Sequence, residues 1–105
     1  MSDAIVVTAR FEPAEERRHA VLGALHQVIP QFQDEPGCLF YEVFETPEGA
    51  FVTLEKWATQ DDLDAHGQGA AIKQLAGALE GALSGRVVIT PLTPVVIGDD
   101  HKADL

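Results

Sequence analysis

The feature that most constrains the fold is a hairpin with a helix directly behind it, in residues 37–66 (GCLFYEVFETPEGAFVTLEKWATQDDLDAH). Apolar and polar residues alternate over residues 38–45 and again over residues 50–58, as they do in half-buried strands. The loop between them contains proline and glycine, which suits a hairpin turn. Thr59 begins a sequence with the spacing of a helix cap, so a short helix that carries His66 follows the second strand.

The chain before this hairpin predicts a strand and a helix. Residues 4–12 are rich in β-branched residues and alternate as a strand does. Pro13 suits the first position of a helix, and apolar residues then recur at helical spacing. Pro30 lies within that apolar stripe, so we expect a kink or an early loose end there. The stripe comprises Val21, Leu22, Leu25, Val28, Ile29 and Phe32.

The chain after the hairpin predicts a second helix and a last strand. The helix carries a second apolar stripe and ends at Gly85, and residues 86–90 form the strand. Pro91 and Pro94 favour an edge position for that strand. The domain spans residues 1–98 and a polar C-terminal tail follows in residues 99–105. The second stripe comprises Ile72, Leu75, Ala76, Leu79 and Leu83.

The element order is therefore βαββαβ, which predicts an α+β, ferredoxin-like antiparallel sheet with both helices on one face. The strands are apolar on both faces: Leu39, Tyr41 and Val43 alternate with Phe40 and Phe44. An antiparallel sheet with one face in water has a clean polar face instead. We therefore expect a homodimer in which two sheets pack face to face.

Charge and composition exclude several classes of partner. The 105 residues include 17 acidic and 7 basic ones, a net charge of -10, so nucleic acid and anionic membrane surfaces are poor partners. We expect no signal peptide and no membrane span, and hence a cytoplasmic protein. A single cysteine, Cys38, lies in an apolar run and is expected to be a buried, inert thiol.

Three side chains carry the concentrated chemistry of the chain: Glu55, Trp57 and His66. Each also has a structural interpretation. Trp57 suits a core position, His66 suits the end of a helix, and Glu55 could pair with one of two arginines, Arg10 and Arg86. Tyr41 is a further core aromatic or acid, whereas His19, His26 and His101 are expected to be solvated.

Ordered motifs along the chain resemble the antibiotic biosynthesis monooxygenase domain family. They are Glu35-Pro36-Gly37-Cys38-Leu39-x-Tyr41-Glu42-Val43, then Phe51-Val52-x-Leu54-Glu55-x-Trp57, then Leu63-Asp64-Ala65-His66. The resemblance implies a dimeric α+β barrel. It also implies oxidation of a small aromatic, quinol-like or polyphenol-like substrate by molecular oxygen, with no flavin, haem or metal.

The resemblance also implies roles for particular residues. Trp57 matches the tryptophan that lines the family cavity, and His66 matches the histidine on the following helix, which suits a catalytic base. Phe51 would help Trp57 to clamp a flat substrate, and Glu55 or Tyr41 would anchor its polar group. Thr53 shares the face of Glu55.

One departure from the family pattern keeps other functions open. Ala71 stands where relatives often carry a second histidine, and residues 70–83 offer no histidine to ligate haem. This favours a non-catalytic dimeric module that binds a small molecule or serves in a stress response. An isomerase or lyase that uses a lone base is a third possibility, because the same fold supports that chemistry.

Overall fold

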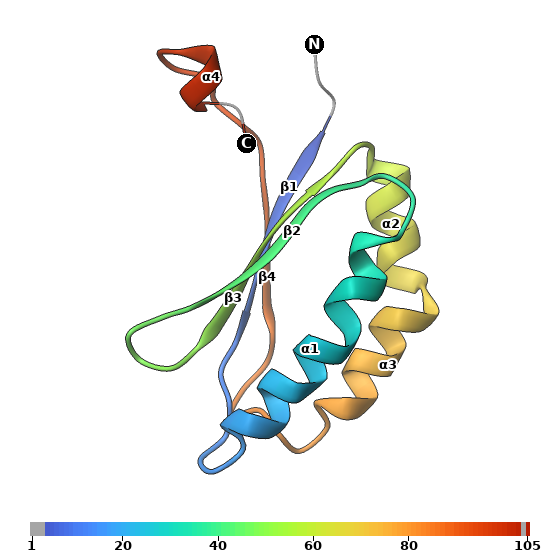
Figure 1. Ribbon diagram of the computed structural model, residues 1–105, viewed down its shortest axis with the longest axis vertical. Coiled ribbons are helices and arrows are strands. Elements are labelled where there is room, and N and C mark those ends of the chain that lie inside the picture. The colour runs from blue at the N-terminus through green and yellow to red at the C-terminus, as the bar shows by residue number, and fades with distance from the viewer. Residues whose placement is uncertain (1–3, 104) are drawn as a thin grey trace.

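A computed structural model of the protein describes residues 4–103 and residue 105. Figure 1 shows a four-stranded sheet with its long helices on one side. The elements are, in chain order, β1 (Ile5–Phe11), α1 (Arg18–Gln33), β2 (Cys38–Glu45), β3 (Phe51–Trp57), α2 (Gln60–Gln68), α3 (Ala70–Ala78), β4 (Val88–Leu92) and α4 (Asp100–Ala103).

The strands form one antiparallel sheet in the order β2-β3-β1-β4. This arrangement confirms the predicted α+β, ferredoxin-like fold. The hairpin β2–β3 has the predicted strands, and β4 lies at an edge, as the prolines indicated. At that edge Pro91 pairs with Val7 of β1.

The start of α1 differs from the prediction. Pro13 forms an isolated bridge with Leu83, and the helix begins only at Arg18. Glu16 explains the difference, because its φ of 68° lies in the left-handed region and cannot belong to a right-handed helix. The backbone N–H of Ala14 donates to the carbonyl of Ala82, at 2.8 Å, so the chain before α1 is tied to the segment after α3.

The ends of α1 and α3 also differ from the expectation. The helix α1 continues through Pro30 to Gln33, and two of its residues beside that proline, Val28 and Phe32, are fully packed in the core. The helix predicted to end at Gly85 ends at Ala78 instead. Gly81, with a φ of 75°, reverses the chain soon afterwards. The last strand accordingly starts at Val88, two residues later than expected.

The core lies between the helices and one face of the sheet. It includes Phe11, Val21, Leu25, Phe32 and Trp57, all nearly or wholly excluded from solvent. Burial of this apolar surface is the main force that holds the helical layer on the sheet.

The other face of the sheet is covered by no helix in Figure 1. It is nonetheless rich in apolar side chains, and three of them are strongly exposed: Phe44 by 52%, Val88 by 56% and Leu92 by 43%. The register places these apolar residues on that face: Val6, Phe40, Phe44, Val52, Leu54, Val88 and Leu92. We call these seven residues the outer face.

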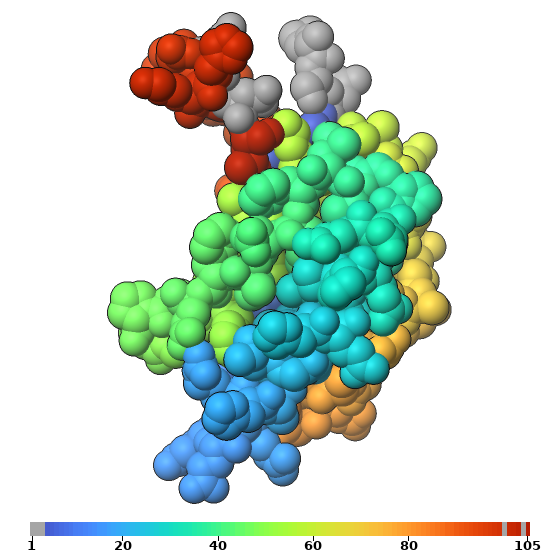
Figure 2. Space-filling view, viewed as in Figure 1, coloured from blue at the N-terminus to red at the C-terminus, as the bar shows by residue number. Residues whose placement is uncertain are grey.

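The chain beyond β4 extends past the end of the sheet, and the Leu105 carbonyl accepts a hydrogen bond from the side chain of Lys56 on β3. Three apolar residues there, Val95, Val96 and Ile97, are exposed, and the short helix α4 follows. In Figure 2 this C-terminal segment forms a separate knob above the rest of the protein.

Candidate functional site

A cavity of about 720 Å³ lies between the sheet and the helices α2 and α3. This volume falls within the range of roughly 300–1,000 Å³ that is typical of small-molecule sites. Apolar side chains of the sheet and of α3 form most of its wall: Val7, Ala9, Phe11, Ile72, Leu75, Leu79, Val87 and Ile89. Tyr41, Glu55 and His66 also line it and supply its chemistry.

Glu55 on β3 is a carboxylate that is only 4% exposed. The Thr53 hydroxyl donates to its Oε2 at 2.9 Å, and the Trp57 indole N–H donates to its Oε1 at 3.0 Å. Both donors lie two residues away, where the strand period puts them on the same face. These bonds offset the cost of burying the carboxylate.

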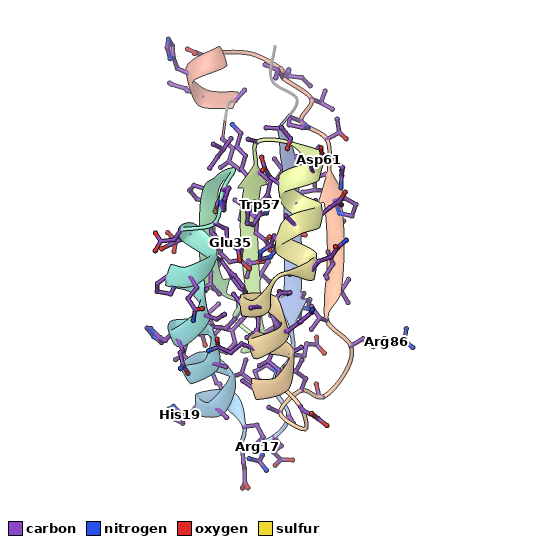
Figure 3. All side chains as sticks on the ribbon, turned by 90° about the vertical axis from the view of Figure 1, so that its right-hand side faces the viewer. Arg17, His19, Glu35, Trp57, Asp61 and Arg86 are labelled. Atoms are coloured by element: carbon purple, nitrogen blue, oxygen red, sulfur yellow. The ribbon has the colours of Figure 1, made fainter. Side chains whose placement is uncertain are left out.

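The arginines considered for Glu55 lie elsewhere. Arg10 pairs with Glu12, and Figure 3 shows Arg86 pointing away from the body of the protein. The suggested structural salt bridge from Glu55 to either arginine is therefore wrong. The sheet register explains why, because Arg10 pairs with Val52 and so lies on the outer side of the sheet.

His66 is held on α2 between two aromatic rings. Its ring is 4.5 Å from that of Trp57, centroid to centroid, and 4.6 Å from that of Phe32, which meets it edge-on. Its Nδ1 is 2.7 Å from Oε1 of Glu35, whereas its Nε2 is 3.9 Å from Oε1 of Glu55. The first distance is a hydrogen bond and the second is too long for one.

Tyr41 contributes a phenol that stays protonated. Burial raises the pKa of its hydroxyl far above the ordinary value, and the negative charge of Glu55 and a hydrogen bond with it raise that pKa further. A neutral phenol at a cavity wall is a hydrogen-bond donor that does not titrate near neutral pH. The pKa of the Cys38 thiol is also raised by burial, so this cysteine stays a thiol as well.

Three of the predicted site residues do not line the cavity. Trp57 and Thr53 are completely buried, and Phe51 is 3% exposed. The indole of Trp57 therefore supports Glu55 and His66 from behind, where the sequence suggested a clamp for the substrate. The three other histidines, His19, His26 and His101, are exposed as expected.

Glu35 is the site residue that sequence reasoning missed. It lies in the turn after α1, 31 residues before His66, where neither strand nor helix periodicity applies. Figure 3 labels it beyond the end of α1, at the same end of the sheet as Trp57. The only signal in the sequence was its place in the Glu35-Pro36-Gly37 motif.

The charges around the cavity are all acidic. Two carboxylates, Glu55 and Asp64, line it, and no lysine or arginine does so in the part of the chain that the structure describes. An anionic ligand would meet like charge here with no cation to offset it. The cavity therefore disfavours an anionic ligand.

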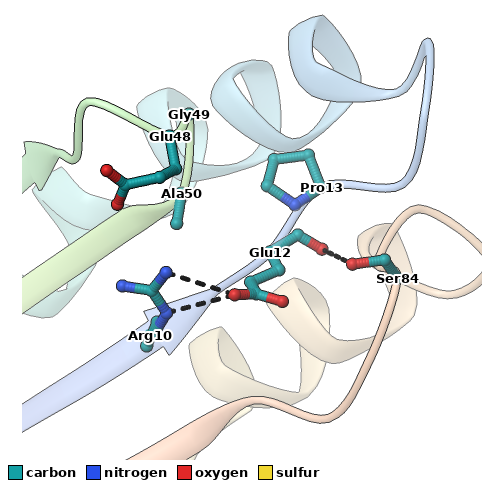
Figure 4. A pocket seen from close by; sticks show the side chains of 7 residues that line it. All are labelled: Arg10, Glu12, Pro13, Glu48, Gly49, Ala50 and Ser84. Carbon is teal, nitrogen blue, oxygen red and sulfur yellow. Dashed lines mark hydrogen bonds and ion pairs between the residues drawn. The ribbon is translucent and has the colours of Figure 1, made fainter.

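A second hollow, shown in Figure 4, lies beside the β2–β3 hairpin loop and has a volume of about 260 Å³. It is polar and shallow, and its one cation, Arg10, is already paired with Glu12 at 3.2 Å. Within residues 4–103, no group of three or more His, Cys, Asp or Glu side chains is arranged to hold a metal ion. No helix in the described part of the chain has the length and apolar character needed to cross a membrane.

Comparison with known proteins adds a family match. The family model described as antibiotic biosynthesis monooxygenase matches residues 4–78. A Mycobacterium tuberculosis protein named "Putative monooxygenase Rv0793" is 31% identical over 67 residues. Those residues are 63% of this chain and 66% of the relative, slightly under two thirds of its length.

Solved structures share the fold. That of Rv0793 superposes with a TM-score of 0.84 at 26% identity, covering 91% of this chain and 99% of the other. A Caulobacter crescentus protein named as a "putative antibiotic biosynthesis monooxygenase" gives 0.83 at 26% identity, covering 90% and 92%. PA3566 from Pseudomonas aeruginosa gives 0.83 over 91% and 98%, and its 21% identity supports the fold alone.

Proposed function

The chain belongs to the antibiotic biosynthesis monooxygenase family, and from this premise we propose that its cavity oxidises a small, uncharged hydroxyaromatic molecule with molecular oxygen. The observation that carries the proposal is the placing of His66. It lines an apolar cavity, and its Nε2 makes no hydrogen bond to Glu55, the carboxylate on that side of the ring. An imidazole with a free nitrogen in such a place suits a general base.

The chemistry follows from what a hydroxyaromatic carbanion can do. For an anthrone, Nε2 of His66 takes the proton of the acidic C–H or of the tautomeric phenol, which leaves an electron-rich anion. The anion passes one electron to oxygen, and the two radicals combine to form a carbon–oxygen bond. The imidazolium returns its proton to the peroxide, and loss of water leaves a quinone carbonyl. One oxygen atom enters the product, the other leaves as water, and no external reductant is consumed.

The walls of the cavity would contribute to that reaction through their polarity and shape. The apolar wall gives the radical pair surroundings of low polarity and accommodates a flat ring system. The neutral Tyr41 hydroxyl lies at the same wall as Glu55 and His66 and shares a hydrogen bond with Glu55, so it adds a polar group that stays uncharged beside the proposed base. Trp57 donates a hydrogen bond to Glu55 and packs on His66, so it holds these two polar side chains in place although it does not line the cavity itself.

Oxidation of anthrone under ¹⁸O-labelled oxygen tests the proposal, with a chelator present throughout. We expect anthraquinone that carries one labelled oxygen atom, formed faster than without protein. In Ala76→Trp an indole would fill the cavity from α3, so the rate should fall to the background. Ala78→Trp is the matched control, because Ala78 is exposed on the same helix and does not line the cavity.

Other outcomes identify the alternatives. Binding of anthrone that Ala76→Trp abolishes, with no labelled product, would contradict oxidation and favour a non-catalytic binding module. Exchange of the C–H proton with solvent, with no uptake of oxygen, would favour an isomerase or lyase that uses the same base. Equal rates in the wild type and Ala76→Trp would place any oxidation outside the cavity.

We propose further that the chain forms a homodimer through the outer face. Seven apolar residues gather there, three of them strongly exposed, and a patch of this kind on a small domain marks an interaction surface. A second copy is the partner that fits, since two copies of one face bury the same residues around a two-fold axis. The same side of the sheet also carries Arg10, Lys56 and Glu42, so it is not dominated by acidic charge.

The dimer is tested by sedimentation velocity. Phe44→Glu puts a charge on the outer face at a side chain that is half exposed in the single chain, so folding should persist while the dimer dissociates to monomers. Gln27→Glu, on the exposed side of α1, adds the same charge elsewhere and should leave the dimer intact. A monomeric wild type, or a dimer unaffected by Phe44→Glu, would contradict this interface.

A further inference from the structure

Glu35 binds the ring nitrogen of His66 that Glu55 does not approach. We propose that Glu35 is a positioning residue, which holds neutral His66 in the tautomer whose Nε2 is the basic nitrogen. The catalytic consequence rests on the proposed function, but the tautomer does not depend on it. Glu35 thereby decides which of the two nitrogens is available to a ligand in the cavity.

The first step is the chemistry of the Glu35–His66 contact. An ionised carboxylate only accepts hydrogen bonds, so at 2.7 Å the Nδ1 atom must carry the hydrogen. A neutral imidazole has a single N–H, and Nε2 therefore keeps its lone pair. Glu55 Oε1, 3.9 Å away, makes no hydrogen bond with that lone pair, and His66 lines the cavity that would hold a ligand.

The second step is that Glu55 does not compete for the hydrogen. Its two oxygens already accept hydrogen bonds from Trp57 and Thr53, at 3.0 and 2.9 Å. A hydrogen on Nε2 would lie too far from Glu55 for a hydrogen bond, because Nε2 and Oε1 are 3.9 Å apart and that carboxylate already accepts two hydrogen bonds. The hydrogen of the neutral imidazole therefore lies on Nδ1, where it makes the short hydrogen bond to Glu35.

The third step is that the two aromatic rings packed closest to His66 do not select a tautomer. Phe32 and Trp57 fix the plane of the imidazole by packing against it, at 4.6 and 4.5 Å between centroids. These rings discriminate weakly between the two N–H positions, because the phenyl ring has no polar atom and the indole N–H is a donor already bound to Glu55. Orientation thus comes from packing, and the choice of nitrogen comes from Glu35.

The fourth step is that Glu35 is itself held in place. Its backbone N–H donates to Phe32 and its carbonyl accepts from Cys38, both at 3.1 Å. Its Oε2 lies at the start of α3, where a Cβ on Gly69 would be 3.8 Å away. This helix has no side-chain cap, and the positive end of its dipole favours a negative oxygen there.

Long-range ¹H–¹⁵N spectra of the labelled protein test the tautomer without any substrate, at a pH where the imidazoles are neutral. We expect His66 to show a protonated Nδ1 and an unprotonated Nε2. The exposed histidines His19, His26 and His101 serve as internal references.

Glu35→Gln should reverse the tautomer. The start of α3 favours the amide oxygen, which turns the NH₂ group towards Nδ1 and forces the hydrogen onto Nε2. Asp34→Asn is the matched control, since it removes the same charge from the neighbouring exposed residue. With anthrone, kcat should fall by roughly 10²-fold or more in Glu35→Gln, as when an orienting carboxylate of a catalytic histidine is made an amide. It should be unchanged in Asp34→Asn.

The outcomes separate this inference from the proposed function. A wild-type His66 with its hydrogen on Nε2 would overturn the role of Glu35, even if anthrone is oxidised. A Glu35→Gln variant with the wild-type tautomer and kcat would overturn it too. The expected tautomer in a protein that does not oxidise anthrone would support the positioning role and reject only the proposed substrate chemistry.

Discussion

His66→Ala is expected to lower kcat for anthrone oxidation by roughly 10²- to 10⁴-fold, the usual contribution of a general base. The physical reason is that neither Glu55 nor Tyr41, the cavity-lining groups described beside it, can replace it. Glu55 is occupied by two hydrogen bonds, and Tyr41 stays protonated because burial and the charge of Glu55 raise its pKa. The measurement is the rate of labelled anthraquinone formation at saturating anthrone.

Controls separate the loss of a base from the loss of structure. His26→Ala removes an exposed histidine of α1 and should leave kcat unchanged. A thermal melt of His66→Ala should show a folded protein, because the core formed by α1 and the sheet does not depend on the imidazole. Unchanged kcat in a folded His66→Ala would remove the proposed base.

Trp57→Ala is expected to destabilise the fold by about 3–5 kcal/mol, the range for truncating a buried aromatic side chain. Trp57 is wholly buried, packs on His66 and Tyr41, and donates a hydrogen bond to Glu55. Its loss would leave both a void in the core and a buried carboxylate with one donor fewer. Urea denaturation at a fixed protein concentration measures the change, since a dimer unfolds in a concentration-dependent way.

Trp57→Phe separates the loss of the hydrogen bond to Glu55 from the void that Trp57→Ala leaves in the core. It keeps an aromatic ring but removes the N–H, so we expect a loss of about 1–3 kcal/mol from the weakened solvation of Glu55. The loss should shrink in a Glu55→Gln background, where no buried charge is left short of donors. A cost below about 1 kcal/mol for Trp57→Ala would show that the indole is not the support that its burial implies.

Local patterns predicted the elements better than their ends. Alternation in residues 38–45 and 50–58 predicted the hairpin, because successive side chains of a strand point to opposite faces of the sheet. The start of α1 could not be found this way. It depends on Glu16 in a left-handed conformation and on a backbone contact between Ala14 and Ala82, which are far apart in the chain.

The candidate site shows the same division. The strand period put Glu55, Trp57 and Thr53 on one face, and the cap at Thr59 put His66 on the following helix. These are short-range relations. The sequence could not show that Trp57 lies behind the cavity while Glu55 and His66 line it, because that depends on how α2 and α3 pack on the sheet.

The sequence by itself determined the order of the strands and main helices, the apolar character of both sheet faces and the position of His66 on the helix after the hairpin. Each of these follows from residues within one or two turns of each other. Only the tertiary structure decided that Glu35 reaches His66 across 31 positions and that Arg10 lies on the wrong face to pair with Glu55. The reason is that such contacts are set by the packing of separate elements, and the chemistry of the cavity depends on them.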